Sequence, residues 1–468
     1  MGFKKKLYQL NPNKETKRVV LQYTKREKRQ ASVTEQSNER NVREMLSNKL
    51  SGTHMGIWLL IPEYLRLGAW DLLQGSFMNT SGTDLNARIA LQLVNEAALC
   101  VNRLRKRDSL CNQGFCLANG LSFLAADETV HELLDSNSMK AYEDLQIALM
   151  MLRREQNHYS DKRVLALDPH RIKSVTQRIM PHKRKIPTEP SRKLMQTFFC
   201  VDAFSGQPLA FTLGSSGKNC SPATLNLINM IEQGGLKEAL FVADKEHFTV
   251  DIINYFDQHP GFDILLPAPE INKVTDLIKQ LEYIPQWAGY ALSSTTFTFD
   301  GGAPQIKLIA QRQGEQSNKY RYSAFLTTSN KNPIDLLTQL FPERWTIEEF
   351  FNFNGDMGWN SASTFNLNIK YGKQSLALIG QAALHQLKNK LPESYKHWTA
   401  AHTAQQVLTN MEGDIKIKDD TIIVTYYRDH ENLFLKKHFE HLPQILQAEG
   451  INPKIPWLYD FKLDFRFK

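Results

Sequence analysis

Acidic residues offer the clearest chemistry in this chain, and four of them stand out: Asp168, Asp202, Asp244 and Glu348. Three carboxylates brought together can bind two divalent cations that prefer oxygen ligands. Two such ions a few ångströms apart stabilise both the attacking and the leaving oxygen when a phosphodiester bond is displaced. This chemistry requires two acids at strand ends on one edge of a sheet and a third acid from a helix that crosses this edge.

The segments around these acids have the patterns of strands. Val164–Asp168 and Ala239–Asp244 are continuous apolar runs that end in an acid, which is typical of strands buried on both faces. Gln196–Val201 and Leu209–Leu213 flank the turn-forming Ser205–Pro208 and therefore predict a hairpin. Each of the two apolar runs would deliver its acid at the end of a buried strand.

Two helices and a fifth strand complete this pattern. Ser221–Pro222 predicts the start of a helix with the serine as its N-cap, and Gly234–Gly235 predicts its end. A second helix extends to Phe256, and Ile264–Leu266 is the fifth strand. Three antiparallel strands followed by parallel strands reached through helices is the ribonuclease H-like order. The predicted fold class is therefore α/β, with a mixed sheet at its core.

Asp168 and Asp202 compete for the first position, and the number of strands favours Asp168. If Asp202 ended the first strand, two further strands would have to precede the helix at Ser221, and only Leu209–Leu213 is available. Asp202 also adjoins a turn, where an aspartate commonly has a structural role. Asp244 has a competing role as well, because it could cap the helix that follows it.

The third acid comes from a helix that opens near Thr346. Thr346 and Glu349 fit a capping box, which gives Glu349 a structural role and leaves Glu348 free. Asp356 is a weaker candidate because it follows Asn354–Gly355, where we expect the helix to fray. Glu348 is therefore the predicted third carboxylate.

Three segments resemble the DDE transposases of bacterial insertion sequences: Leu165–His170, Leu240–Asp244 and Phe341–Glu348. The resemblance covers roughly residues 160–390, including a long β-rich insertion, since 103 residues separate Asp244 from Glu348. By this resemblance, the insertion contacts the ends of the mobile element. Trp287 within it either stacks on an unpaired base or is buried in a core, and burial is the favoured alternative.

One branch of this family carries the signature Tyr-x2-Arg-x3-Glu-x6-Lys around its catalytic glutamate. Two of its four positions match here, as Arg344 and Glu348. Phe341 stands in place of the tyrosine and Gly355 in place of the lysine, so the signature is incomplete. The glycine removes the positive charge of the lysine. The helix is also expected to end near Gly355, so this position would no longer lie on a helix.

The resemblance implies a transposase that cleaves DNA and transfers strands at the terminal inverted repeats of its own element. Asp168 and Asp244 would bridge two Mg²⁺ (or Mn²⁺) ions, Glu348 would complete the ligand set, and Arg344 would hold a phosphate. It also implies a homodimer on double-stranded DNA, a target DNA, and a place in the bacterial cytoplasm at the nucleoid. Two alternatives remain open: a metal-dependent DNA nuclease without strand transfer, and a non-catalytic DNA-binding remnant.

Two basic stretches indicate binding to a polyanion independently of the family. Residues 1–30 hold ten Lys or Arg against two Glu, and residues 161–193 hold ten against three acids. Such clusters bind phosphates with an affinity that falls as salt rises, and a solvated charged surface is the alternative. The candidate phosphate contacts are Arg171, Lys173, Lys183, Arg184 and Lys185, with Lys370 or Lys373 as substitutes for the missing signature lysine.

Shifts in composition and in hydrophobic period predict the domain order. The order comprises a basic polar tail (1–50), a helical domain (51–158), a catalytic core in two parts (159–268 and 330–390), the β-rich insertion (269–329), and a C-terminal α+β region with a hairpin (391–468). The helical domain contains either a helix-turn-helix that reads DNA or an ordinary helical bundle.

Composition excludes several other classes of protein. The 468 residues are too many for one compact core. The longest apolar runs, Ile57–Ile61 and Ile147–Leu152, fall far short of the roughly 18 residues of a membrane span. The five cysteines contain no C-x2-C pair, which argues against a structural zinc site or a disulfide framework. We therefore expect a soluble intracellular protein with several domains and no signal peptide.

Overall fold

The computed structural model describes residues 33–77, 83–101, 109–173, 182–183, 188, 190–215, 220–359, 366–427 and 432–468. The chain forms two compact units. The central unit comprises residues 138–382 and 399–401, and the terminal unit comprises residues 1–137, 383–398 and 402–468. Arg184, Lys185 and the basic stretch 1–30 lie outside the described residues.

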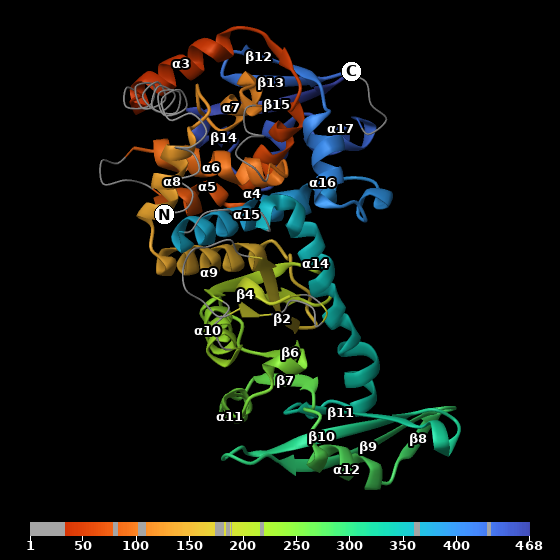
Figure 1. Cartoon of the computed structure of the whole chain (residues 1–468). Helices are drawn as coiled ribbons and strands as arrows, with labels where there is room; N and C mark the ends of the chain where they lie inside the picture. The colour runs from red at the N-terminus through yellow and green to blue at the C-terminus, as the bar shows by residue number, and fades with distance from the viewer. Residues whose placement is uncertain are drawn as a thin grey trace. The chain divides into compact units, whose positions relative to one another are not determined.

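A large mixed sheet organises the central unit (Figure 1). Five of its strands form the core: β2 (Val164–Lys173), β4 (Arg192–Asp202), β5 (Pro208–Ser215), β6 (Ala239–Ala243) and β7 (Phe262–Pro267). In space their order is β5-β4-β2-β6-β7, with β2 antiparallel to β4 and parallel to β6. This is the predicted ribonuclease H-like arrangement, and the predicted fold class is confirmed.

One helix before these strands and two helices between them bury apolar faces against the sheet. They are α9 (Met139–Glu155), α10 (Cys220–Gln233) and α11 (Val250–Gln258). Their core cluster includes Leu227 and Ile231 of α10, Ile252 of α11, and Leu165 and Phe241 of the strands. Helix α10 begins at Cys220, two residues earlier than predicted, so Ser221 lies in its first turn rather than at the N-cap. The Ser221 hydroxyl lies 2.7 Å from that of Thr249.

The insertion continues this sheet instead of folding as a separate one. It contains α12 (Asn272–Gln280), β8 (Ile284–Trp287), β9 (Tyr290–Thr298), β10 (Gln305–Gln313) and β11 (Arg321–Thr327). Strand β11 pairs antiparallel with β7 and also with β10, so the hydrogen-bonded ladder passes from the core into the insertion. The two-residue strand β3 (His182–Lys183) extends the opposite side by pairing with β4. Figure 1 shows the twisted ribbon formed by β8–β11 with α12 beside it.

Glu348 lies on α14 (Thr346–Asn354), which short helical turns precede and follow. Before it come α13 (Pro333–Asp335), a π-turn (Leu336–Leu340) and a 3-10 turn (Pro342–Trp345), and after it comes a second π-turn (Gly355–Trp359). Trp345, which precedes α14, is already helical (φ −61°, ψ −22°), and no side chain caps this helix. The predicted capping box of Thr346 and Glu349 is therefore wrong, because that motif needs an extended residue at the N-cap.

The α-helix α14 ends at Asn354 with Gly355 as its C-cap, in agreement with the expected end near Gly355. The chain then continues as a π-turn: Gly355 keeps helical angles (φ −54°, ψ −39°), and the backbone leaves the helical region at Gly358, whose φ is +96°. A positive φ suits glycine because it has no Cβ. Helix α15 (Leu367–Lys388) follows.

The terminal unit combines helices from the N-terminal half with a sheet from the C-terminal end. Its helical elements include α3 (Glu35–Ser47), a 3-10 turn (Met55–Leu60), α4 (Ile61–Leu67), α5 (Ala69–Phe77), α6 (Leu85–Ala98), α7 (Gln113–Ala118), α8 (Asp127–Ser136), α16 (Ala400–Thr403, at the boundary of the two units), α17 (Asn432–Phe439) and α18 (Leu442–Ala448). Its strands are β1 (Leu50–Gly52), β12 (Gly413–Lys418), β13 (Thr421–Tyr426), β14 (Lys454–Ile455) and β15 (Phe461–Phe467).

Helix α3 and the hairpin β12–β13 can be compared with the predictions for the two ends of the chain. Helix α3 lies within the stretch expected to be a polar tail and buries Val42 and Leu46. The hairpin β12–β13 forms as predicted, with Asp419 of its turn at φ +57°. Among the described helices, none is both long and apolar enough to cross a membrane.

A buried carboxylate ties the helical part of the terminal unit together. Glu63 of α4 is fully buried and forms ion pairs with Arg66, at 3.1 Å, and with Lys390. Removing one partner from a buried pair leaves the other charge without compensation. We expect Glu63→Gln to lower the free energy of unfolding by about 1–3 kcal/mol, measured by urea denaturation. Glu393→Gln removes an ion pair to Lys396 that is largely exposed, and we expect it to change stability little; equal effects of the two variants would contradict this prediction.

Candidate active site

Strand register places Asp168 and Asp244 side by side. Strands β2 and β6 run parallel, and Leu167 is the partner of Ala243 at the end of their ladder. Asp168 and Asp244 are the next residues along these two strands, so they are neighbours. Asp244 directly follows the end of β6, but Asp168 lies within β2, where it pairs with Phe199 of β4. The expectation that the first strand ends at Asp168 is therefore wrong, because its pairing with β4 continues to Lys173. Because neighbouring strands lie about 4.8 Å apart, these two carboxylates can share a ligand.

The residues after Asp244 turn sharply into a 3-10 turn (Lys245–His247). One carboxylate oxygen of Asp244 accepts a hydrogen bond of 2.6 Å from the backbone N–H of Lys245. Asp244 therefore caps a helical turn, which is the competing role considered for it from the sequence, and the cap uses its Oδ1 atom. A carboxylate has further acceptor capacity, so the cap is compatible with a second role.

Helix α14 brings Glu348 over the same part of the sheet. Ile347 and Phe350 are buried, and Phe351 packs on His170 of β2 with a distance of 4.4 Å between ring centroids. Phe199 of β4 lies 5.4 Å from Phe351 by the same measure. This apolar face fixes α14 on β2 and β4, while the Glu348 side chain keeps 44% of its surface exposed.

Arg344 connects the helix to the strand. Its Nη1 atom lies 3.6 Å from Oδ1 of Asp168, and its Nη2 atom lies 3.9 Å from Oε1 of Glu348. The guanidinium is only 13% exposed. The three predicted carboxylates thus lie around one region, with Arg344 between two of them.

The electrostatics of Asp168 reflect this crowding. Its pKa is raised from 3.8 to about 7, chiefly by burial; the positive charge of Arg344 lowers it, and the negative charges of Asp244 and Glu348 add to the increase. Glu246 contributes in the same direction as the other acids. Carboxylates that repel one another and lose hydration are the environment that a divalent cation relieves.

The donor set fits a hard cation, since it consists of carboxylate oxygens. No group of three or more His, Cys, Asp or Glu within the part of the chain that the structure describes is assembled closely enough to hold a metal ion as it stands. The position of Arg344 gives a physical reason, because its positive charge already occupies the space between Asp168 and Glu348. Binding a metal there would require this side chain to move.

The rival acids have structural partners elsewhere. Asp202 ends β4 and pairs with Leu165 near the start of β2, whereas Asp168 pairs with Phe199 farther along the same ladder. Its oxygens accept hydrogen bonds from the backbone N–H groups of Ser160, Phe204 and Ser205, at 3.0, 3.0 and 2.7 Å respectively. Asp356 accepts a hydrogen bond of 3.1 Å from the N–H of Ala401, which likewise gives this acid a structural partner.

Several residues near the site were missed by sequence reasoning. Glu246 follows Asp244 by two residues and binds the guanidinium of Arg171. His247 is buried, and its Nδ1 atom lies 2.9 Å from Oγ1 of Thr224 and 3.3 Å from Sγ of Cys220. Burial lowers the pKa of His247 to about 4, so it is neutral at pH 7. Glu246 and His247 follow Asp244 closely in the sequence, and this proximity was the signal that could have placed them near the site.

The predicted phosphate contacts occupy varied surroundings. Arg171 lies on β2 and pairs with Glu246, Lys173 ends the same strand, and Lys183 lies on β3 opposite Arg192. Lys370 is 2% exposed, and burial lowers its pKa to about 8. A buried lysine is poorly placed to meet a DNA backbone, which disfavours Lys370 as the substitute for the signature lysine.

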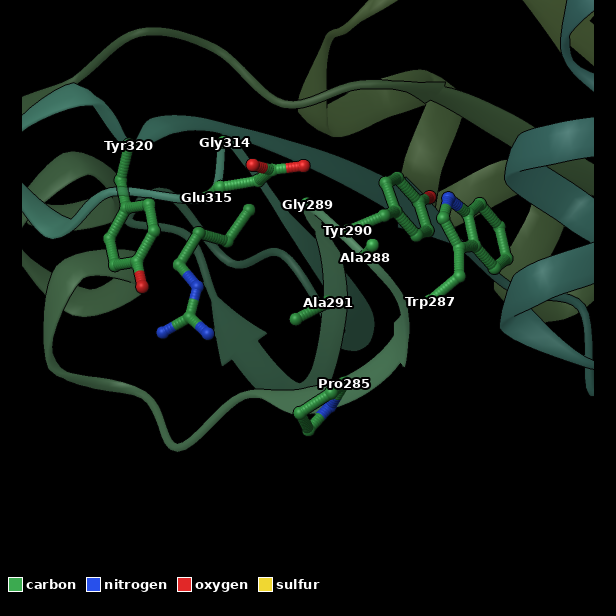
Figure 2. Close-up of a pocket in the computed structure, with 10 residues that line it drawn as sticks. Pro285, Trp287, Ala288, Gly289, Tyr290, Ala291, Gly314, Glu315 and Tyr320 are labelled. Carbon is green, nitrogen blue, oxygen red and sulfur yellow. The ribbon is translucent and has the colours of Figure 1, made fainter.

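The tip of the insertion carries an aromatic surface (Figure 2). Trp287 is 51% exposed and stacks on Tyr290, with 4.4 Å between ring centroids and 8° between planes. The favoured expectation that Trp287 lies in a core is therefore wrong, because it ends the edge strand β8 beside the turn to β9. The guanidinium of Arg312 lies over Tyr320, 4.4 Å from its centroid. Figure 2 shows the paired Trp287 and Tyr290 rings on one side of a hollow of about 280 Å³, with Tyr320 on the other.

This chain was found to be similar to known proteins in two comparisons. Residues 159–371 match the family model described as transposase DDE domain. A comparison with curated protein sequences gives no match. Among solved structures, the chain is similar to a piggyBac transposase synaptic complex with hairpin DNA, at 13% identity and a TM-score of 0.41, over 77% of this chain and 82% of that one.

Proposed function

We propose that this chain cleaves DNA at the terminal inverted repeats of its own element and joins the ends to a target DNA, because residues 159–371 match the family model described as transposase DDE domain. The domain type indicates DNA cleavage and transposition in general. The parallel pairing of β2 with β6, which makes Asp168 and Asp244 neighbours, is the observation that supports the more specific proposal. Glu348 reaches the same region from α14.

Each acid has a role in this proposal. Asp168 and Asp244 would bridge two Mg²⁺ (or Mn²⁺) ions, and Glu348 would complete the ligand set. The bound ions would stabilise the attacking and leaving oxygens of the displaced phosphodiester. The buried apolar face of α14 holds Glu348 and Arg344 in register with Asp168, so that Arg344 can contact a phosphate of the reacting strand.

The proposed DNA surface extends beyond these acids. Arg171, Lys173, Lys183, Arg184 and Lys185, together with residues 1–30, would contact phosphates without reading sequence. Because cutting and joining two ends requires them to be held together, we propose that the chain acts as a homodimer on double-stranded DNA. In a bacterial cell it would work at the nucleoid.

The aromatic tip of the insertion supports contact with unpaired bases. An exposed Trp287 already stacked on Tyr290 offers a flat, preorganised face, and Arg312 over Tyr320 adds positive charge beside it. Trp345 is 61% exposed beside Arg344 and offers a second aromatic face near the acids. Base stacking on such rings is largely independent of sequence.

We expect Trp287→Ala to weaken binding to a duplex with unpaired terminal bases by about 1–3 kcal/mol, measured by fluorescence anisotropy. Trp287→Phe keeps an aromatic face and should retain most of the affinity. A fully paired blunt duplex of the same sequence should bind both variants alike. Equal binding of the Ala variant and the unchanged protein to the frayed duplex would contradict a stacking role.

A strand-joining assay tests the proposed function as a whole. The substrate is a set of pre-cut ends from the inverted repeats that flank the gene, incubated with a plasmid target and Mg²⁺. Joined products would support transposition. Cleavage without joining would point instead to a metal-dependent nuclease, and end binding without either reaction would point to a non-catalytic remnant.

A further inference from the structure

Arg344 occupies an unusual place for a residue proposed to bind DNA. Its guanidinium lies 3.6 Å from Asp168 and 3.9 Å from Glu348, and it is largely buried. Arginine does not lose its proton in proteins. In this state, therefore, a permanent positive charge lies between two of the three carboxylates proposed to hold metal ions.

Neighbouring groups leave Arg344 as the counter-ion of this cluster. Arg171, the other arginine that acts on this region, has its guanidinium engaged by Glu246 and by Gln196. Asp244 and Glu246 are negative and add to the repulsion at Asp168. Arg344 is thus the charge that compensates Asp168 directly, and its loss would leave the acids facing one another.

Two divalent ions and a guanidinium would repel one another strongly in so small and poorly hydrated a space. We infer that Arg344 exchanges partners: it pairs with Asp168 and Glu348 while no metal is bound, and it pairs with a DNA phosphate once the carboxylates hold metal. Arg344 is then a positioning residue that couples two ligands. This inference rests on the proposed function, because it takes the carboxylates as metal ligands.

The geometry provides a direction for the exchange. The guanidinium carbon lies 5.5 Å from the ring centroid of Trp345, which is 61% exposed. Arg344 therefore borders the surface at which a DNA strand would arrive. Coupling between two ligands is reciprocal, so a phosphate that draws Arg344 outward would make Asp168 and Glu348 available to metal, and metal would release Arg344 for phosphate.

Equilibrium binding of Mn²⁺ to the full-length protein tests this inference without measuring activity. By calorimetry in the absence of DNA, we expect Arg344→Gln to bind Mn²⁺ about fivefold or more tightly than the unchanged protein. Arg344→Lys keeps the charge and should stay close to the unchanged protein. Arg163→Gln is a matched control. Arg163 immediately precedes β2, the strand that carries Asp168, and pairs with Glu238 at the exposed surface. This variant should leave the Mn²⁺ affinity unchanged.

A duplex DNA added to the same titration measures the coupling. It should raise the Mn²⁺ affinity of the unchanged protein by a larger factor than that of Arg344→Gln, in which the competing charge is already gone. If Arg344→Gln binds Mn²⁺ no more tightly than the unchanged protein while Asp168→Asn abolishes binding, the exchange is overturned and the proposed site stands. If Asp168→Asn binds Mn²⁺ normally, the proposed site itself is wrong. Mn²⁺ should also raise the melting temperature of Arg344→Gln more than that of the unchanged protein, which checks that this variant is folded.

Discussion

Replacing any one of the three acids by its amide should abolish DNA cleavage while leaving end binding nearly intact. Asp168→Asn, Asp244→Asn and Glu348→Gln each keep the shape of the side chain and remove the negative charge that a hard cation requires. Changes to groups that only orient metal ligands typically cost 10–100-fold in metal affinity or activity, so loss of a ligand should exceed about 100-fold. A nicking assay on supercoiled plasmid carrying the element ends, with binding measured in parallel, gives both readouts.

Asp202→Asn is the control for this series. Asp202 accepts three backbone hydrogen bonds beside the start of β2, so its amide variant should lose stability and still cleave DNA once folded. Normal nicking by Asp168→Asn together with loss of nicking in Asp202→Asn would reverse the assignment. Loss of DNA binding in the three amide variants would instead assign these acids to the fold.

The core of this fold could be predicted because its strands are buried on both faces. Val164–Asp168 and Ala239–Asp244 have no polar alternation, so their apolar runs identify strands. Asp244 marks the end of β6, but β2 continues past Asp168 to Lys173, which its apolar run did not indicate. The number of strands before α10 then separated Asp168 from Asp202, and the register between Leu165 and Asp202 agrees with that placement. Local composition and topology pointed to the same arrangement.

The surroundings of α14 could not be predicted in the same way. Thr346 and Glu349 have the spacing of a capping box, but the helical turns before Thr346 supply the preceding backbone and make a cap unnecessary. Gly355 stays helical because the break falls three residues later, at Gly358. Such effects depend on how the preceding and following turns pack, which residue spacing does not record.

Exposure at the insertion depended on pairing between distant strands. Trp287 resembles a core residue by type, and only the position of β8 at the edge of the sheet puts it at the surface. The continuity of β7 with β11 was likewise invisible in the sequence, because antiparallel pairing between these strands has no local signature. As a result, Trp287 on β8 and Asp168 on β2 belong to one hydrogen-bonded sheet.

Metal binding should depend steeply on pH because of Asp168. Burial and the neighbouring acids raise its pKa to about 7, and a carboxylate must lose its proton to bind a metal ion. We expect the apparent affinity for Mn²⁺ to fall about tenfold for each pH unit below 7, as for a single competing proton, and to level off above pH 7. Calorimetric titrations from about pH 5 to pH 8 would measure this dependence.

The stability of the metal-free protein should change with pH in the opposite sense to its metal affinity. Between the unfolded pKa near 3.8 and the folded pKa of about 7, the folded protein keeps a proton on Asp168 that the unfolded chain has released. Stability falls with rising pH wherever the folded state binds more protons, so this contribution is present below about pH 4 and is lost by pH 7. Asp168→Asn has no such proton, and the difference in unfolding free energy between the two proteins should grow across this window. A constant difference from pH 4 to pH 7 would show that Asp168 ionises as freely as an exposed acid, and that the three carboxylates are not held together in the metal-free state.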